Sequence, residues 1–177
     1  MRLFGLTLGK GEDAGLPPET AAQMAPGTEI RYAPGLIAHF QDTHKELAAL
    51  IAQLHDTASA GRYGEAEKAL HELKSVLYAH LLEENVRLYT YLSYCVKDDA
   101  DGAELMSDMR LEMGRIGRDV TRFIRAYAET GIGAGNVASF LQQLGGITAK
   151  LHDRLQREES SLYTLYQPPA HFARQDA

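Results

Sequence analysis

The sequence contains a single cysteine and no dense group of basic residues, and each absence narrows the range of functions. A lone Cys95 excludes a disulfide within the chain and favours a reducing compartment. The 18 lysine and arginine residues are spread along a chain of formal net charge -6. Since phosphate binding needs a concentrated basic face, we do not expect a nucleic-acid partner.

Long apolar segments are also missing. No run approaches the roughly 20 apolar residues that a membrane-spanning helix requires, and residues 1–6 lack the extended apolar stretch of a signal peptide. We therefore expect a cytoplasmic protein without a membrane partner. The chain has neither a Cys-x-x-Cys pair nor a glycine-rich phosphate loop, and no serine or cysteine has a persuasive histidine partner, so we do not expect an enzyme.

Strand patterns are absent too, because no run alternates β-branched or aromatic residues with polar ones. Instead, four stretches repeat apolar residues at steps of three and four, the spacing of one face of an α-helix. They cover about residues 35–60, 63–94, 103–129 and 136–166, and the links at 97–102 and 130–135 are polar or rich in glycine. The sequence therefore predicts an all-α, up-down-up-down four-helix bundle.

The chain has the size and composition of one globular domain, with 177 residues of which 45% are hydrophobic. The predicted bundle occupies residues 35–168, and Asn136 is placed to cap its fourth helix. Residues 1–34 are predicted to form an irregular N-terminal arm, with a helical turn near 18–24 and a packed part near 30–32. Residues 169–177 are predicted to form a tail, because Pro168 and Pro169 end the last helix.

Ionisable residues interrupt three of the four apolar faces. His44 lies on the first face, His80 and Glu84 lie on the second, and Arg154 and Glu158 lie on the fourth. An unpaired buried charge costs several kcal/mol, so these groups need partners, and alignment of the four faces by level places all five in one core layer. The remaining histidines lie off these faces or in the tail and are interpreted as solvated: His39, His55, His71, His152 and His171.

Two explanations fit this layer, and the residues alone leave both open. The first is a metal site, because two imidazoles and two carboxylates suit iron, manganese or zinc, and bundle cores commonly hold such sites. The second is a metal-free network in which the carboxylates pair with the arginine and the histidines.

The same residues make the chain resemble the hemerythrin-like, or HHE cation-binding, family over about residues 30–168. The motifs that carry the resemblance are LI at 36–37, DTHKEL at 42–47, HLLEEN at 80–85 leading to LY at 88–89, and REE at 157–159 leading to LY at 162–163. The family's fold is a four-helix bundle that normally holds two irons. The resemblance implies that His44, His80, Glu84 and Glu158 are metal ligands.

The other half of the family's site is not preserved. The family's third helix has a histidine directly after a glutamate, where this chain has Met113 after Glu112. Its fourth helix has a histidine four residues before the carboxylate, where this chain has Arg154. The resemblance thus implies one metal ion, most often iron, with Arg154 replacing the charge of the second ion and Met113 filling the vacated space. Tyr89 and Tyr163 either pack in the core or donate to a bound ligand.

From the resemblance we expect a metal-binding protein that binds or senses a diatomic ligand such as oxygen or nitric oxide, in signalling, iron handling or a stress response. Reversible oxygen binding is not expected, since one iron cannot supply the two electrons that make peroxide. Oxidative chemistry at a 2-His/carboxylate iron is a further alternative, although no substrate pocket is visible in the sequence.

A weaker resemblance points to a different class of function. Residues 151–159, LHDRLQREE, are similar to the last helix of the Rsd/AlgQ anti-sigma regulators, a family of metal-free bundles. That similarity implies a module that binds a protein partner. Tyr91 or Tyr94, at the end of the second helix, either forms part of the partner surface or only packs, as tyrosines at helix ends more often do.

Overall fold

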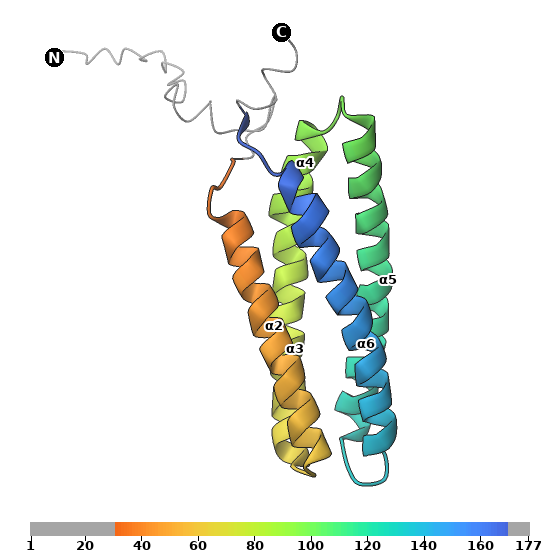
Figure 1. Cartoon of the computed structure of the whole chain (residues 1–177). Coiled ribbons are helices and arrows are strands. Elements are labelled where there is room, and N and C mark those ends of the chain that lie inside the picture. The colour runs from red at the N-terminus through yellow and green to blue at the C-terminus, as the bar shows by residue number, and fades with distance from the viewer. Residues whose placement is uncertain (1–30, 170–177) are drawn as a thin grey trace, which may run out of the picture.

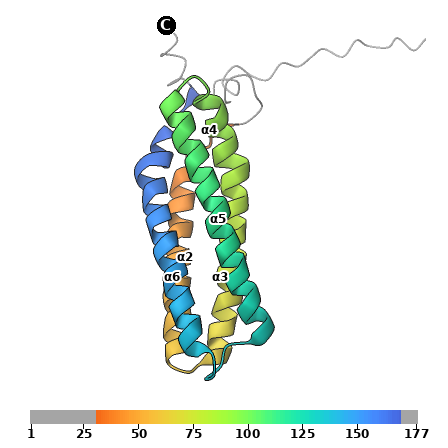
Figure 2. The same cartoon turned by 90° about the vertical axis from the view of Figure 1, so that its right-hand side faces the viewer.

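The computed structural model describes residues 31–169, and no strand occurs among them. Its helices are α2 (Leu36–Ser59), α3 (Tyr63–Glu83), α4 (Thr90–Cys95), α5 (Ala100–Thr130) and α6 (Val137–Arg157), and its shorter turns are η1 (Glu84–Tyr89), η2 (Glu158–Leu162) and η3 (Tyr163–Leu165). These elements form four rods, of which the first is α2, the second is α3 with η1 and α4, the third is α5, and the fourth is α6 with η2 and η3. Figures 1 and 2 show the rods side by side, with successive rods running in opposite directions. The predicted all-α four-helix bundle is confirmed. The turn predicted near 18–24 and the tail from residue 170 lie outside the described residues.

The structure corrects one predicted helix start and refines one predicted cap, and hydrogen bonds explain both. Helix α5 begins at Ala100 rather than near residue 103, because the Asp99 side chain accepts a hydrogen bond from the Gly102 amide at 3.1 Å and caps the helix. Asn136 occupies the N-cap position of α6, but its side chain does not cap that helix. It instead accepts from the Gly133 amide at 2.8 Å and donates to the Gly131 carbonyl at 2.9 Å, which ties the α5–α6 loop together.

The second and fourth rods each contain a π-helical turn that the spacing did not predict. The turns η1 and η2 start at Glu84 and Glu158. In an α-helix two residues five apart point roughly 140° away from each other, whereas a π-turn places them on the same side. Beyond each turn, the positions that face the core are therefore shifted by one residue along the sequence. In the fourth rod the residues buried beyond Glu158 are Leu162, Tyr163 and Tyr166, in place of the predicted Ser161 and Leu165.

The core consists of two apolar clusters at different heights of the bundle. The lower cluster surrounds the α2–α3 and α5–α6 loops and reaches up to Leu47, Leu77, Met113 and Leu151. The upper cluster surrounds the opposite end and reaches down to Phe40, Leu88, Met109 and Leu162. On three of the four rods, the ionisable residues of the apolar faces lie between the lower and the upper cluster. They form a polar layer with apolar packing above and below it.

The upper end of the bundle is closed by tyrosines. The ring of Tyr32 stacks on that of Tyr166 with centroids 5.0 Å apart, and the Tyr166 hydroxyl accepts from the Ala33 amide at 2.9 Å. Tyr91 is fully buried and donates to the Gln167 carbonyl at 2.6 Å, so of its two predicted roles packing is correct and the partner surface is not. Tyr94 is 40% exposed. Within residues 31–169, no helix combines the length and apolarity needed to cross a membrane.

The cap of α5 can be tested by replacing its acceptor. We expect Asp99→Ala to lower the free energy of unfolding by about 1 kcal/mol, because the Gly102 amide then loses its partner at the helix N-terminus. Urea unfolding measures the change. The control is Asp98→Ala, since the Asp98 carboxylate contacts only Lys97, 3.5 Å away at the surface. An equal loss in both variants would contradict the capping role.

Candidate metal centre

The five ionisable residues of the apolar faces lie in the core layer between the two clusters. His44 comes from the middle of α2, His80 from the last turn of α3, and Arg154 from the last turn of α6. Glu84 and Glu158 are the first residues of the two π-turns. Each of the five is at most 5% exposed, which agrees with their predicted positions. Helix α5 contributes no charged side chain to this layer.

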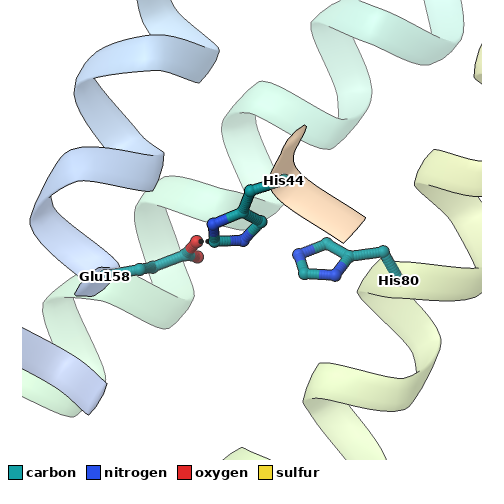
Figure 3. Close-up of side chains that lie close together, drawn as sticks. All are labelled: His44, His80 and Glu158. Carbon is teal, nitrogen blue, oxygen red and sulfur yellow. Dashed lines mark ion pairs between the residues drawn. The ribbon is translucent and has the colours of Figure 1, made fainter. Parts of the chain in front are cut away.

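Three of these residues bring potential metal-ligating atoms close together. One atom each from His44, His80 and Glu158 lies within 4.8 Å of the other two. Figure 3 shows the two imidazoles and the carboxylate converging from three different rods. The His44 Nε2 atom is 3.4 Å from Glu158 Oε2, and the two imidazole rings meet nearly edge to face with centroids 4.9 Å apart. Imidazole and carboxylate donors at this spacing are typical ligands of first-row transition metals.

The orientation of His44 is set by a residue that the sequence reasoning missed. Glu159 Oε1 lies 2.8 Å from His44 Nδ1 and holds the outer side of the ring. This leaves Nε2 directed at Glu158, with the Tyr163 hydroxyl 3.2 Å away. A carboxylate behind a histidine is the usual outer partner of a metal-bound imidazole. The doubled glutamate of the fourth rod was a signal for this role, because one carboxylate can face the core while its neighbour reaches around the ring.

Both histidines are held in the form that binds metals. Burial lowers the pKa of His44, although hydrogen bonding to Glu159 opposes the shift. Burial, followed by repulsion from His44, lowers the pKa of His80 to about 4. Both imidazoles are therefore neutral at pH 7 and offer a lone pair without first losing a proton.

The charge of the layer depends on Arg154. Its Nη2 atom is 2.6 Å from Glu158 Oε1 and donates to the Tyr89 hydroxyl at 2.7 Å. Burial raises the pKa of Glu158, and repulsion from Glu84 raises it further; burial also raises the pKa of Glu84. Two carboxylates beside one guanidinium retain one proton between them, so the layer without a metal ion is close to neutral.

A cation fits the atoms that this layer leaves unpaired. Apart from the proton that Glu84 and Glu158 share, four buried atoms have no hydrogen-bond partner among the described residues: His80 Nδ1, both carboxylate oxygens of Glu84 and Glu158 Oε2. Unpaired polar atoms are costly in a core, and a metal ion beside them would supply a partner. Glu84 is not part of the close group of three, but its two free oxygens keep it as a predicted ligand.

Of the remaining predicted residues, some lie in or beside the polar layer and others face outward. Met113 is buried in the lower cluster, at the level expected for a space-filling residue. Glu112 is not in the polar layer, because its carboxylate turns outward and pairs with Arg157 Nη1 at 2.6 Å. Tyr89 and Tyr163 both direct their hydroxyls into the layer, toward Arg154 and His44. Four histidines predicted to be solvated are exposed, and the fifth lies outside the described residues: His39, His55, His71 and His152, then His171.

The shared proton gives the metal-free protein a distinct pH dependence. The folded state holds a proton on the Glu84–Glu158 pair that the unfolded chain releases near its ordinary glutamate pKa of 4.5. Stability is therefore lost as the pH rises, and we expect the free energy of unfolding to fall between about pH 7 and pH 8.5. The two histidines do not contribute in this window, because their pKa values are lowered.

Urea unfolding of chelator-treated protein at several pH values measures this slope. Glu84→Gln is the matched comparison, since it leaves one carboxylate beside Arg154 and removes the need for the proton. We expect a flatter profile for this variant. Identical slopes in the two proteins would refute the shared proton.

Comparison with known families supplies an independent line of support. The model of the hemerythrin HHE cation binding domain matches residues 35–166, which include all four rods and the polar layer. No curated protein and no solved structure shows significant similarity to the chain. The predicted resemblance to hemerythrin-like proteins is confirmed, whereas none of these comparisons supports the resemblance to Rsd/AlgQ regulators. The chain belongs to the hemerythrin HHE cation-binding domain family.

Proposed function

We propose that this protein binds one first-row transition metal ion, with iron as the expected ion, through His44, His80, Glu84 and Glu158. The observation that carries the proposal is the buried cluster of His44, His80 and Glu158, in which His80 Nδ1 and Glu158 Oε2 have no hydrogen-bond partner among the described residues. Bound iron would supply coordination positions at which a small molecule such as oxygen or nitric oxide binds. The residues of the chain would hold the ion, Glu159 would keep the His44 ring in position, and the apolar clusters would exclude bulk water.

An internal repeat in the structure supports a single ion. The second rod carries His80, then Glu84 at the start of a π-turn, then Tyr89. The fourth rod carries Arg154, Glu158 and Tyr163 at the same spacing and with the same type of turn. The guanidinium of Arg154 on the fourth rod thus occupies the position that the imidazole of His80 has on the second rod. A permanent cation there repels a second metal ion and balances the second carboxylate.

We propose a role in sensing, iron handling or stress response, in which the protein binds its ligand without transforming it. One metal ion is poorly suited to reversible oxygen storage, because reduction of oxygen to peroxide takes two electrons. The expected location in the cytoplasm stays a prediction that rests on the sequence.

A metal-free module that binds a protein partner is the alternative. A polar network that exists for stability alone is expected to pair its buried atoms, because each unpaired one costs free energy. The unpaired acceptors of His80, Glu84 and Glu158 therefore favour the metal-binding function.

Metal content distinguishes the two functions. We expect about one iron per chain in untagged protein from iron-supplemented cells, measured by plasma mass spectrometry. His80→Ala should remove the iron, because it deletes a buried ligand. His152→Ala is the control, since His152 is exposed on the same bundle. Absence of metal in the unmodified protein would reject the proposal in favour of the partner-binding module, and two ions per chain would show that other residues rebuild a second site.

The role of Arg154 can be tested by restoring the ligands of the family's second half-site. We expect the double variant Met113→His, Arg154→His to raise metal content from about one toward about two ions per chain, because two imidazoles replace a space-filling side chain and a fixed positive charge. The same mass spectrometry measures the change. Met109→His with Arg157→His is the control, since neither position carries a predicted ligand. An unchanged content in a folded double variant would contradict the substitution of a metal by Arg154.

A further inference from the structure

Helix α5 carries a row of charged side chains whose sign changes halfway along the helix. The residues follow one another at steps of three and four, so they share one face, and all of them are exposed. The first half of the row is acidic and the second half is basic: Asp101, Glu104 and Asp108, then Arg115, Arg118 and Arg122. Leu111 lies between the two halves in the same row and is 60% exposed.

This row faces away from the rest of the bundle. One side of α5 faces the fourth rod, where Glu112 pairs with Arg157 at 2.6 Å. Its other side faces the second rod, where Tyr78 donates a hydrogen bond to the Thr121 hydroxyl at 2.9 Å. The row runs between these two sides, and Figure 2 shows α5 at the front of the bundle. A partner can therefore reach the whole row.

The helix dipole explains only the ends of the row. Acidic residues in the first turn and basic residues in the last turn stabilise a helix, but the effect falls off within one turn. Asp108 and Arg115 lie near the middle of a helix that spans Ala100–Thr130. The charges in the middle of the row need a different explanation.

Ion pairs within the chain do not explain them either. Arg122 pairs with Asp119 at 3.6 Å. Within residues 31–169, the other charged members of the row form no ion pair. Most of the row is therefore available to a partner of suitable charge.

Exposed apolar side chains lie beside the row. Among residues 31–169, the large apolar side chains that are exposed belong to the second and third rods: Leu82, Val86 and Tyr94, then Leu111. The Tyr78–Thr121 hydrogen bond and the Arg110 guanidinium, 5.9 Å from the centroid of the Tyr89 ring, fix the relative height of these rods. Leu82, Val86 and Leu111 lie between these two contacts. An exposed apolar group of this kind, bordered by charged residues, is typical of an interaction surface.

The order of the charges makes the row complementary to itself. When two copies of α5 cross at Leu111 in opposite directions, each residue lies opposite the one that is equally far from Leu111 on the other side. Arg118 of one copy then lies opposite Glu104 of the other, and Arg115 lies beside Asp108. Helices in the same direction would bring like charges together. The favourable arrangement has a two-fold axis at the leucine pair, so each contact is made twice.

We propose that two copies of this chain form a dimer through the outer face of α5. Leu111 lies at the two-fold axis, and the acidic half of each helix contacts the basic half of the other. A second copy fits better than a purely acidic partner, because the row presents both signs of charge. The face does not include the polar layer, so the dimer does not depend on the proposed metal-binding function.

Sedimentation equilibrium of the full chain measures the dimer. We expect monomer and dimer in a ratio that depends on protein concentration, with a dissociation constant that rises with salt, because exposed ion pairs are screened. A chain that stays monomeric up to about 1 mM would overturn the proposal. Equal dissociation constants at low and high salt would overturn it as well.

Two charge reversals test the predicted contacts. Glu104→Arg and Arg118→Glu each replace two attractive contacts per dimer by repulsive ones, so we expect each variant alone to have a dissociation constant roughly tenfold or more above that of the unmodified protein. An equimolar mixture of the two variants should form a heterodimer, because the arginines of one chain then face the glutamates of the other at both positions. Unchanged association of either variant, or a mixture that stays monomeric, would overturn the proposal.

Two further variants control for net charge. Glu46→Arg makes the same change in net charge as Glu104→Arg at an exposed position of α2, and the dissociation constant should not change. The double variant Glu104→Arg, Arg118→Glu keeps the net charge of -6 and should dimerise like the unmodified protein. An equal loss in Glu46→Arg, or no recovery in the double variant, would overturn the proposal.

Metal content and folding separate this inference from the proposed function. Circular dichroism shows whether each variant is folded, and mass spectrometry gives its metal content. One metal ion per chain in a monomeric protein would reject the dimer and leave the metal site intact. A dimer without metal would support the interface and reject the metal site.

Discussion

Charge balance in a layer that solvent scarcely reaches constrains the centre of this bundle. Glu84 and Glu158 bring two carboxylates into the core, and the ion pair of Arg154 with Glu158, at 2.6 Å, compensates only one of them. The negative charge of the second carboxylate must be compensated by a retained proton or by a metal ion. The demand of the layer for a proton or a cation follows from this requirement.

The π-turns connect that requirement to the fold. Each turn begins at a core glutamate and brings a tyrosine five residues later back onto the buried face. Tyr89 then hydrogen-bonds to Arg154, and Tyr163 lies beside His44. In a regular α-helix these hydroxyls would point away from the layer, so the irregular backbone completes the polar shell. π-helical turns are rare and occur frequently at functional sites. Their position at the candidate ligands therefore agrees with a functional role.

The sequence predicted which residues lie on buried helix faces where the helix is regular. It predicted individual side-chain contacts less well. The steps of three and four placed His44, His80 and Glu84 on buried faces, because a regular helix repeats its facing residues at that spacing. The same reasoning misplaced Ser161 and Leu165, since an inserted residue rotates the face without any change in composition. Glu159 was missed, because which of two adjacent residues contacts a side chain of the core depends on the neighbouring rods.

The sequence by itself determined the helical bundle, the level of the polar layer and the identity of its five ionisable residues, because these follow from local spacing and from the cost of burying charge. Only the tertiary structure decided which atoms meet. It drew His44, His80 and Glu158 together while Glu84 stayed outside the close group, and within residues 31–169 it gave the Nε and Nη1 donors of Arg154 no hydrogen-bond partner. Contacts between side chains on different rods depend on rotamers and on the register of packing, and neither is encoded in the spacing along one helix.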